Sequence, residues 1–301
     1  MALGTNHQTK TTGDKFIPEI WSDEVVATYK SNLIAANLIK KLNFRGKKGD
    51  SVHIPKPGRG SANAKAASTQ VVLNTDTATE VVVAIDQHWE YSVLIEDIVE
   101  TQALASMRQF YTDDAGYALA RKVDSLLLQL GRGVNGGDGT AGYTGAYSGA
   151  DGTTAYTGTA GALTDAAIRR TIQRLDDNDV PMDGRFLIVP PSSRNTLMCI
   201  ARYTEQAFVG EAGSANTIRN GEVGNVYGVP VFVTSNADTA TDGDRIALLG
   251  HKDFAVLAEQ QAVRTQTQYK QEWLGNLFTA DTIFGVKELR DGSAIALAVP
   301  A

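Results

Sequence analysis

The feature that most constrains this chain is a helical repeat of apolar residues from Leu104 to Leu130, interrupted only by Gly116. The apolar side chains recur every three or four residues, which is the spacing that gives a helix one apolar face. Gly131 and Gly133 follow the last of them and favour a helix end there. About 27 residues at about 1.5 Å each give a helix of roughly 40 Å. We expect a helix of this length to lie across a sheet or a partner.

The segment from Ser51 to Glu96 changes to short runs typical of β-strands, at 52–54, 71–73, 81–85 and 89–95. Large apolar residues are almost absent from the stretch between the first two runs, and no acidic residue interrupts its basic side chains. Those basic side chains are Lys56, Arg59 and Lys65. We expect a long hairpin whose loop is disordered in the monomer or orders on a partner. Its basic tip is either a solvated loop or a cationic finger that pairs with a neighbour's carboxylates.

The N-terminal part, from Phe16 to Leu42, has the pattern of an amphipathic helix. Trp21, Val25, Tyr29 and Leu33 follow at four-residue steps, and Pro18 suits the first turn. The stripe is too narrow to be stable by itself. We therefore expect an arm that is held by other subunits rather than by the core of its own chain.

The second half of the chain predicts an α+β fold. Thr164 is a candidate N-cap for a helix that carries Ile168, Ile172 and Leu175 on one face, and a short helix is expected from Ser192 to Tyr203. Strands are expected at 186–189, 229–233, 246–249, 277–286 and 294–299. Residues 133–161 are rich in Gly, Thr, Ala and Tyr and are interpreted as a surface loop or insertion.

Motifs that carry chemistry are absent from the sequence. His7, His53, His88 and His251 have no metal-ligand spacing, and no nucleophile elbow or phosphate loop occurs. Gly-x-Gly-x-x-Gly occurs twice between 131 and 142, but after a helix rather than between a strand and a helix. We therefore expect no enzyme, no metal and no cofactor. The single cysteine, Cys199, has apolar neighbours and is expected to be buried.

Net charge limits the partners. Lys plus Arg number 28 and Asp plus Glu number 34, which gives a net charge of -6. A chain of this charge is not expected to wrap nucleic acid through a broad basic surface. The polar N-terminus and the absence of a long apolar run predict neither export nor a membrane span.

The order of these parts resembles the major capsid protein of tailed phages, the family with the Hong Kong 97-like fold. Arm, basic excursion, long helix and a small α+β segment follow one another in the order of that family. The residues that carry the resemblance are Phe16 to Glu19 with Trp21, Gly49-Asp50-Ser51-Val52, Ile54-Pro55, Leu175-Asp176, Val180-Pro181, Gly184-Arg185, Val189-Pro190-Pro191, Gly224, Val226, Gly228, Pro230-Val231 and Ser235-Asn236.

The resemblance implies a division into named parts. These are an N-terminal arm (1–48), an extended hairpin loop (49–96), a peripheral domain with the long helix and the Gly-rich insertion (97–161), an axial domain (162–255), return strands of the peripheral domain (256–285) and a final axial strand (286–301). It also implies that many copies form hexamers and pentamers of an icosahedral virion shell. That shell would be assembled in the host cytoplasm and would enclose double-stranded DNA without sequence-specific binding.

Other partners and residue roles follow from the same resemblance. Few residues precede Phe16, which favours a separate scaffolding protein; a portal and a decoration or cement protein are further expected partners. Expected inter-subunit contacts are Trp21, Tyr29, Lys56, Arg59 and Lys65. Expected cations of the inner surface are Arg108, Arg121, Lys122 and Arg132, although an ordinary solvated helix face would also explain them. Two alternatives are a shell of the encapsulin type around cargo enzymes and a soluble enzyme with a Gly-rich lid.

Overall fold

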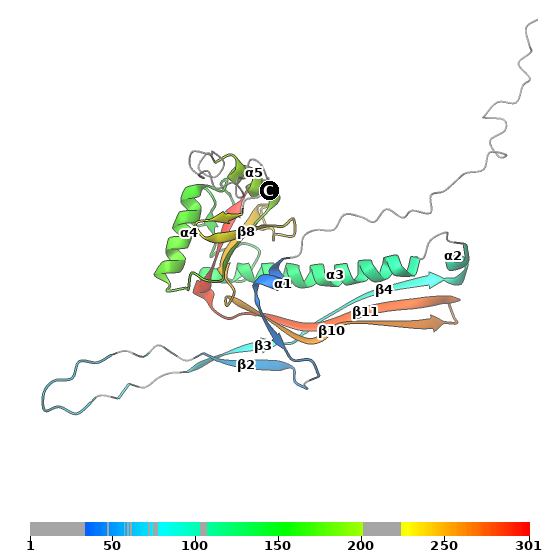
Figure 1. Cartoon of the computed structure of the whole chain (residues 1–301), viewed down its shortest axis with the longest axis horizontal. Coiled ribbons are helices and arrows are strands. Elements are labelled where there is room, and N and C mark those ends of the chain that lie inside the picture. The colour runs from blue at the N-terminus through cyan, green and yellow to red at the C-terminus, as the bar shows by residue number, and fades with distance from the viewer. Residues whose placement is uncertain are drawn as a thin grey trace, which may run out of the picture.

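The computed structural model describes residues 34–301 except 47, 57, 59, 61, 72, 75–77, 103–106 and 201–223, and it leaves out the side chains of 100, 102 and 107–109. Two lobes are joined by a long helix, and a hairpin projects from beneath them (Figure 1). We call the lobe built on a four-stranded sheet the elongated lobe, and the one built on a six-stranded sheet the compact lobe. No helix in these residues is long and apolar enough to cross a membrane.

The elongated lobe is a sheet covered on one face by a helix. Its strands lie in the order β1 (Lys40–Asn43), β10 (Ala255–Lys270), β11 (Gly275–Glu288), β4 (Gln87–Glu96). β1 runs parallel to β10, and the other pairs are antiparallel. Helix α3 (Met107–Gln129) runs along the sheet, with the short α2 (Asp97–Gln102) before it (Figure 1). The predicted long helix is therefore confirmed.

Helix α3 packs on this sheet through buried apolar side chains. Ala115 and Leu119 of α3 pack on Phe278 and Ala280 of β11, and all four are buried. The helix then continues beyond the sheet, where Leu127 and Leu128 are buried in the core of the compact lobe. One straight element thus contributes to both cores, as its length of roughly 35 Å allows.

The compact lobe has a core on each face of its sheet. Its strands are β5 (Tyr147–Ser148), β12 (Ala294–Val299), β9 (Arg245–His251), β6 (Arg185–Val189), β8 (Val229–Val233) and β7 (Asn225–Val226), in that spatial order. Every residue of β12 is buried, and its alternate side chains enter the two cores. Such an all-apolar strand is typical of a sheet covered on both sides.

Two helices and three 3-10 turns complete the compact lobe and the junction. Helix α4 (Asp165–Asp177) begins at the predicted cap, where the Ala167 amide donates to Thr164 Oγ1 over 3.2 Å. Helix α5 (Pro191–Met198) ends earlier than the predicted Tyr203, which lies outside the described residues. The short 3-10 turns are η2 (Leu130–Arg132), η3 (Val134–Gly136) and η4 (Asp291–Ser293).

The hairpin consists of β2 (Ser51–Lys56) and β3 (Thr79–Ala84), paired antiparallel. Val83 packs with Val256 and Ala258 of β10, so the base of the hairpin covers part of the sheet face that α3 leaves open. Beyond the base, residues 62–71 are exposed. The predicted strand at 71–73 is wrong, because Val71 and Leu73 have no strand partner and stand 65% and 89% exposed.

The predicted extent of the hairpin to Glu96 is also wrong. Strand β4 pairs with β11 over its whole length, from Gln87 opposite Phe284 to Glu96 opposite Gly275. It therefore belongs to the elongated lobe. The alternating pattern of 81–95 does not distinguish two strands of one hairpin from two strands of different sheets.

The arm differs from its prediction where the structure describes it. Helix α1 spans only Ala35–Leu38, and Lys40–Asn43 forms strand β1, so no helix continues to Leu42. Parallel pairing with Val256–Glu259 of β10 outweighs the helical pattern. Ile34, Ala35 and Ile39 are buried in this chain's own core, so this end of the arm is not held by other subunits alone. Most of the predicted arm helix, residues 16–33, lies outside the described residues.

The Gly-rich stretch is not a surface loop. Tyr143 and Tyr156 are 1% and 4% exposed in the core of the compact lobe, and Tyr147–Ser148 adds a strand to its sheet. A side chain at Gly137 or Gly145 would collide with backbone carbonyl oxygens, of Arg132 and Val134 respectively. Glycine is therefore needed for close backbone packing at these positions. Cys199, by contrast, is exposed rather than buried.

A buried carboxylate joins the arm, the helix and the compact lobe. Asp124 of α3 is fully buried and accepts from the Ala35 amide over 2.7 Å and from Asn236 Nδ2 over 3.0 Å. Asp124 and its two partners lie up to 201 positions apart along the chain, from Ala35 to Asn236. The exit of the arm from the body is thus fixed relative to both lobes.

Replacing Asp124 with alanine should destabilise the protein by about 2–3 kcal/mol, because the buried Ala35 amide and the half-buried Asn236 amide group would lose their acceptor. Urea unfolding of the full chain measures this loss, with Arg121→Ala at an exposed site of the same helix as the control. An Asp124→Ala variant as stable as the control would show that these hydrogen bonds do not hold the parts together.

Candidate assembly surface

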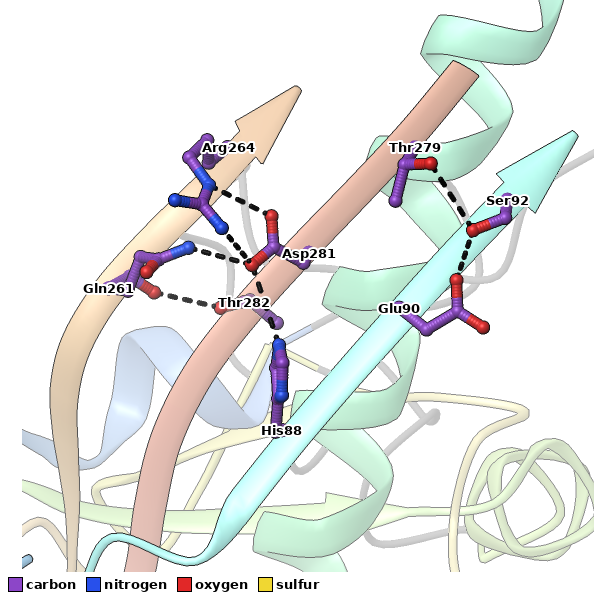
Figure 2. A network of polar contacts seen from close by, with 8 residues as sticks. All are labelled: His88, Glu90, Ser92, Gln261, Arg264, Thr279, Asp281 and Thr282. Carbon is purple, nitrogen blue, oxygen red and sulfur yellow. Dashed lines mark hydrogen bonds and ion pairs between the residues drawn. The ribbon is translucent and has the colours of Figure 1, made fainter. Parts of the chain in front are cut away.

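The face of the elongated sheet opposite α3 is polar beyond the hairpin base. Successive side chains of a strand point to opposite faces, so Phe278 and Ala280 face α3 while Thr279 and Asp281 face the other way. Directly opposed partners share this face, including Ser92 and Glu90 of β4 and Arg264 of β10. Figure 2 shows these side chains together.

Asp281 is the centre of this polar face. Its carboxylate accepts from Arg264 Nε over 3.1 Å and Nη2 over 2.9 Å, and from Gln261 Nε2 over 2.9 Å. His88 Nε2 lies 3.5 Å from the same carboxylate (Figure 2). Only 9% of the Asp281 side chain is exposed, although it lies on the face without a covering helix. Three neighbouring strands are therefore tied together by one carboxylate.

The electrostatics of this group follow from its partners. Hydrogen bonds from Arg264 hold the pKa of Asp281 below its ordinary value of 3.8, and burial opposes them by raising it. Two bulges in β10, between Glu259 and Gln261 and between Gln261 and Arg264, shift the register of the strand. This shift brings both donors to the same carboxylate, while Thr282 Oγ1 donates to the Gln261 carbonyl over 3.0 Å (Figure 2).

A second set of contacts continues the face toward β4. Ser92 Oγ bonds to the Glu90 carboxylate and lies 3.5 Å from Thr279 Oγ1 (Figure 2). These hydroxyls and the Glu90 carboxylate are bonded to one another within the sheet. Within the described residues, no group of three or more His, Cys, Asp or Glu side chains could hold a metal ion. The face offers a rigid polar surface for contact.

Apolar side chains lie exposed at both ends of the long axis. In the hairpin these are Val71 and Leu73, and at the far end they are Trp273 and Leu274 of the β10–β11 turn with Ile98 of α2. Trp273, Leu274 and Ile98 are 64%, 66% and 60% exposed. Clusters of exposed apolar side chains mark surfaces that bind other macromolecules.

The predicted inter-subunit residues fall in different places. Lys56 ends β2 and is exposed, lining a groove of about 460 Å³ against the compact lobe. Lys65 is exposed in the hairpin loop. Trp21, Tyr29 and Arg59 lie outside the described residues. Lys56 and Lys65 are thus both on the hairpin, but Lys56 faces its own chain.

The four predicted inner-surface cations do not form one set. Arg121 is exposed on α3, whereas Lys122 lies over the Trp89 ring, 4.1 Å from its centroid. Arg132 forms two hydrogen bonds with Asp238, of 2.7 and 3.0 Å. Arg108 is in α3, but its side chain is outside the described part. Among the three of these cations whose side chains the structure describes, Arg121 is the one that is exposed and has no ion pair or ring contact.

The sequence patterns did not predict the buried, hydrogen-bonded carboxylates of Asp281 and Asp124. Each is a single carboxylate within a strongly apolar strand or helix pattern. A lone acidic residue among apolar ones could have indicated a buried, hydrogen-bonded carboxylate. Their partners lie 17 to 193 residues away along the chain, from Arg264 to His88 of the Asp281 network. No local spacing could identify them.

Comparisons with known proteins agree with one another. A family model described as "Phage capsid protein" matches residues 36–280. The structure is similar to that of Mycobacterium phage Che8, with a TM-score of 0.76 and 23% identity over 94% of this chain and 97% of that one. It is similar to the capsid of cyanophage P-SCSP1u, with a TM-score of 0.75 and 20% identity over 99% and 96%. For the capsid of Ralstonia phage GP4 the values are 0.65 and 17% over 98% of each chain. No individually curated protein matches the chain.

The Asp281 network predicts a loss of stability in acid. A carboxylate with a depressed pKa contributes stability above its ordinary value of 3.8 and loses it as the pH falls through the lower folded value. Asp281→Asn should therefore be less stable than the wild type at pH 7, by about 1–3 kcal/mol, and this difference should shrink as the pH falls below 3.8.

Urea unfolding between pH 2 and pH 7 measures this difference, and Glu96→Gln, at an exposed site at the end of β4, is the matched control. A difference between Asp281→Asn and wild type that stays constant across this pH range would contradict the role given to the ionised carboxylate.

Proposed function

The chain belongs to the phage capsid protein family, and we propose that it is the major capsid protein of a tailed phage, which forms an icosahedral shell around double-stranded DNA. The family match covers 36–280, most of the chain, and it is the observation that carries the proposal. The α+β fold expected from the sequence agrees with the similarity to phage capsid structures.

The distribution of burial supports assembly. Both lobes have cores of buried apolar residues, whereas every described residue of the hairpin from 62 to 74 is exposed. A two-stranded hairpin is marginally stable in water unless another surface covers it. The exposed Val71 and Leu73 are the side chains that such a surface would bury. We propose that the hairpin lies over a neighbouring subunit, against the polar face centred on Asp281.

The alternatives lack support of this kind. An enzyme with a Gly-rich lid would need that segment to move, but Tyr143 and Tyr156 anchor it in the core. A cargo-enclosing shell of the encapsulin type would be consistent with the fold, but the matching family is one of phage capsid proteins. A virion shell is therefore the function that we propose.

The finer parts of the proposal follow the family resemblance. Hexamers and pentamers would be the units of the shell, with a scaffolding protein, a portal and a decoration or cement protein as partners, and assembly would take place in the host cytoplasm. The genome would be enclosed without base reading, because a net charge of -6 disfavours binding by counterion release. Arg121 is the exposed cation that we assign to screening packed phosphate.

Leu73→Asp should block assembly while leaving the subunit folded. The side chain is 89% exposed, so its replacement costs the monomer little, but a charge at this position would have to be desolvated in an interface. Sedimentation and negative-stain microscopy should find shells for the wild type and for Ala67→Asp, which adds the same charge at an exposed alanine of the same loop.

The proposal for the hairpin fails if Leu73→Asp shells form as readily as those of the Ala67→Asp control. The unassembled Leu73→Asp protein also tests the DNA part of the proposal by filter binding at physiological salt. Weak retention that does not depend on sequence is expected, and tight, sequence-selective retention would argue against simple enclosure.

A further inference from the structure

Glu288 lies where the two lobes join. It is the last residue of β11, and the next residue, Leu289, donates its amide to the Phe254 carbonyl over 2.7 Å, just before β10 begins. The turn that follows α3 passes the same point, since Gly133 lies against the Glu288 carboxyl. Three passages of the chain between the lobes therefore meet around Glu288.

The carboxyl of Glu288 is placed unfavourably for a charge. Its Oε1 is buried and has no hydrogen-bond partner. Its Oε2 is 2.8 Å from the position that a Cβ on Gly133 would take, so a larger residue at 133 would displace the carboxyl. A buried oxygen without a partner is tolerated far better in a neutral carboxyl than in a carboxylate.

The charged groups around Glu288 do not compensate for this burial. Asp291 of η4 repels a negative charge, and its carboxylate is fixed by the Gly136 amide at 2.9 and 3.1 Å. Lys287 of β11 and Lys56 of β2 attract it, but both are exposed and screened by water. On the α3 side, Arg132 is bound to Asp238, and on the η4 side Arg290 is exposed.

We propose that Glu288 is a protonation-dependent latch between the two lobes, closed while its carboxyl is protonated and loosened when it is ionised. Burial, followed by the charge of Asp291, raises its pKa to about 7. The latch therefore operates near neutral pH. The inference concerns the folded chain itself and does not depend on the proposed function.

The sign of the effect follows from linkage. A carboxyl whose pKa is raised in the closed state destabilises that state as the pH rises from its ordinary value of 4.5 to the raised one, and the penalty is complete above the latter. Between pH 6 and pH 8 the equilibrium constant for local opening should therefore rise about tenfold. Opening is defined here as exposure of Glu288 to water.

Hydrogen exchange of the full chain, held in one assembly state, tests the latch. The reporters are the amides of Leu289 and Gly136, which are bonded to Phe254 and Asp291 across the junction. After correction for the intrinsic exchange rate, opening in the wild type should rise about tenfold between pH 6 and pH 8. Glu288→Gln, which cannot ionise, should keep the low-pH protection at both values.

A second variant tests the geometry without removing the carboxyl. Gly133→Ala places a Cβ against Glu288 Oε2 and should push the end of this flexible side chain toward water, which removes most of the tenfold pH response. Glu272→Gln, at an exposed site in the β10–β11 turn, should respond to pH as the wild type does.

The latch is supported if the wild type shows the response and both Glu288→Gln and Gly133→Ala lose it. It is overturned if wild-type protection does not change with pH, or if Glu288→Gln retains the wild-type response. The wild-type pH series decides the question even if one variant fails to fold.

Discussion

The structure depends on a single buried carboxylate that holds the arm, the long helix and the compact lobe in one arrangement. Asp124 accepts from Ala35 on one side and from Asn236 on the other, and it is fully buried. Nearby, Arg132 and Tyr143 both bond to Asp238, which adds a second tie between the end of α3 and the compact lobe. Because buried polar groups bond only in particular geometries, these contacts set the relative position of the parts more strictly than apolar packing does.

This fixed body contrasts with the hairpin. The hairpin packs on the body at its base, through Val83 and its neighbours on β10, and in its described outer part the apolar Val71 and Leu73 are exposed. A subunit that assembles into a closed shell needs both properties, a body that keeps its shape and a segment whose burial requires another copy. The hairpin meets the second requirement, and the surface that we propose for it is the polar face of another copy, where the Asp281 carboxylate is already bonded to Arg264 and Gln261.

Periodicity predicted α3, α4 and the buried strands of the compact lobe, because their apolar side chains recur at the spacing of each element. It failed for β1, where Leu42 belongs to a parallel pair formed with residues more than 200 positions away. Composition failed for 133–161, since glycines that allow close backbone packing resemble those of a flexible loop. The polar networks could not be predicted, because the partners of Asp281 and Asp124 come from distant segments. The apolar residues Val71 and Leu73 were predicted to form a strand, whereas they are exposed and have no strand partner.

The central claim is that the hairpin is completed by a neighbouring copy, and photo-cross-linking in assembled particles tests it most directly. A benzoylphenylalanine in place of Leu73, with subunits of two isotopic labels mixed before assembly, separates cross-links between copies from those within one chain. The account predicts cross-links between differently labelled copies, from position 73 to peptides of β4, β10 or β11. Intact particles with cross-links only within one chain would contradict it.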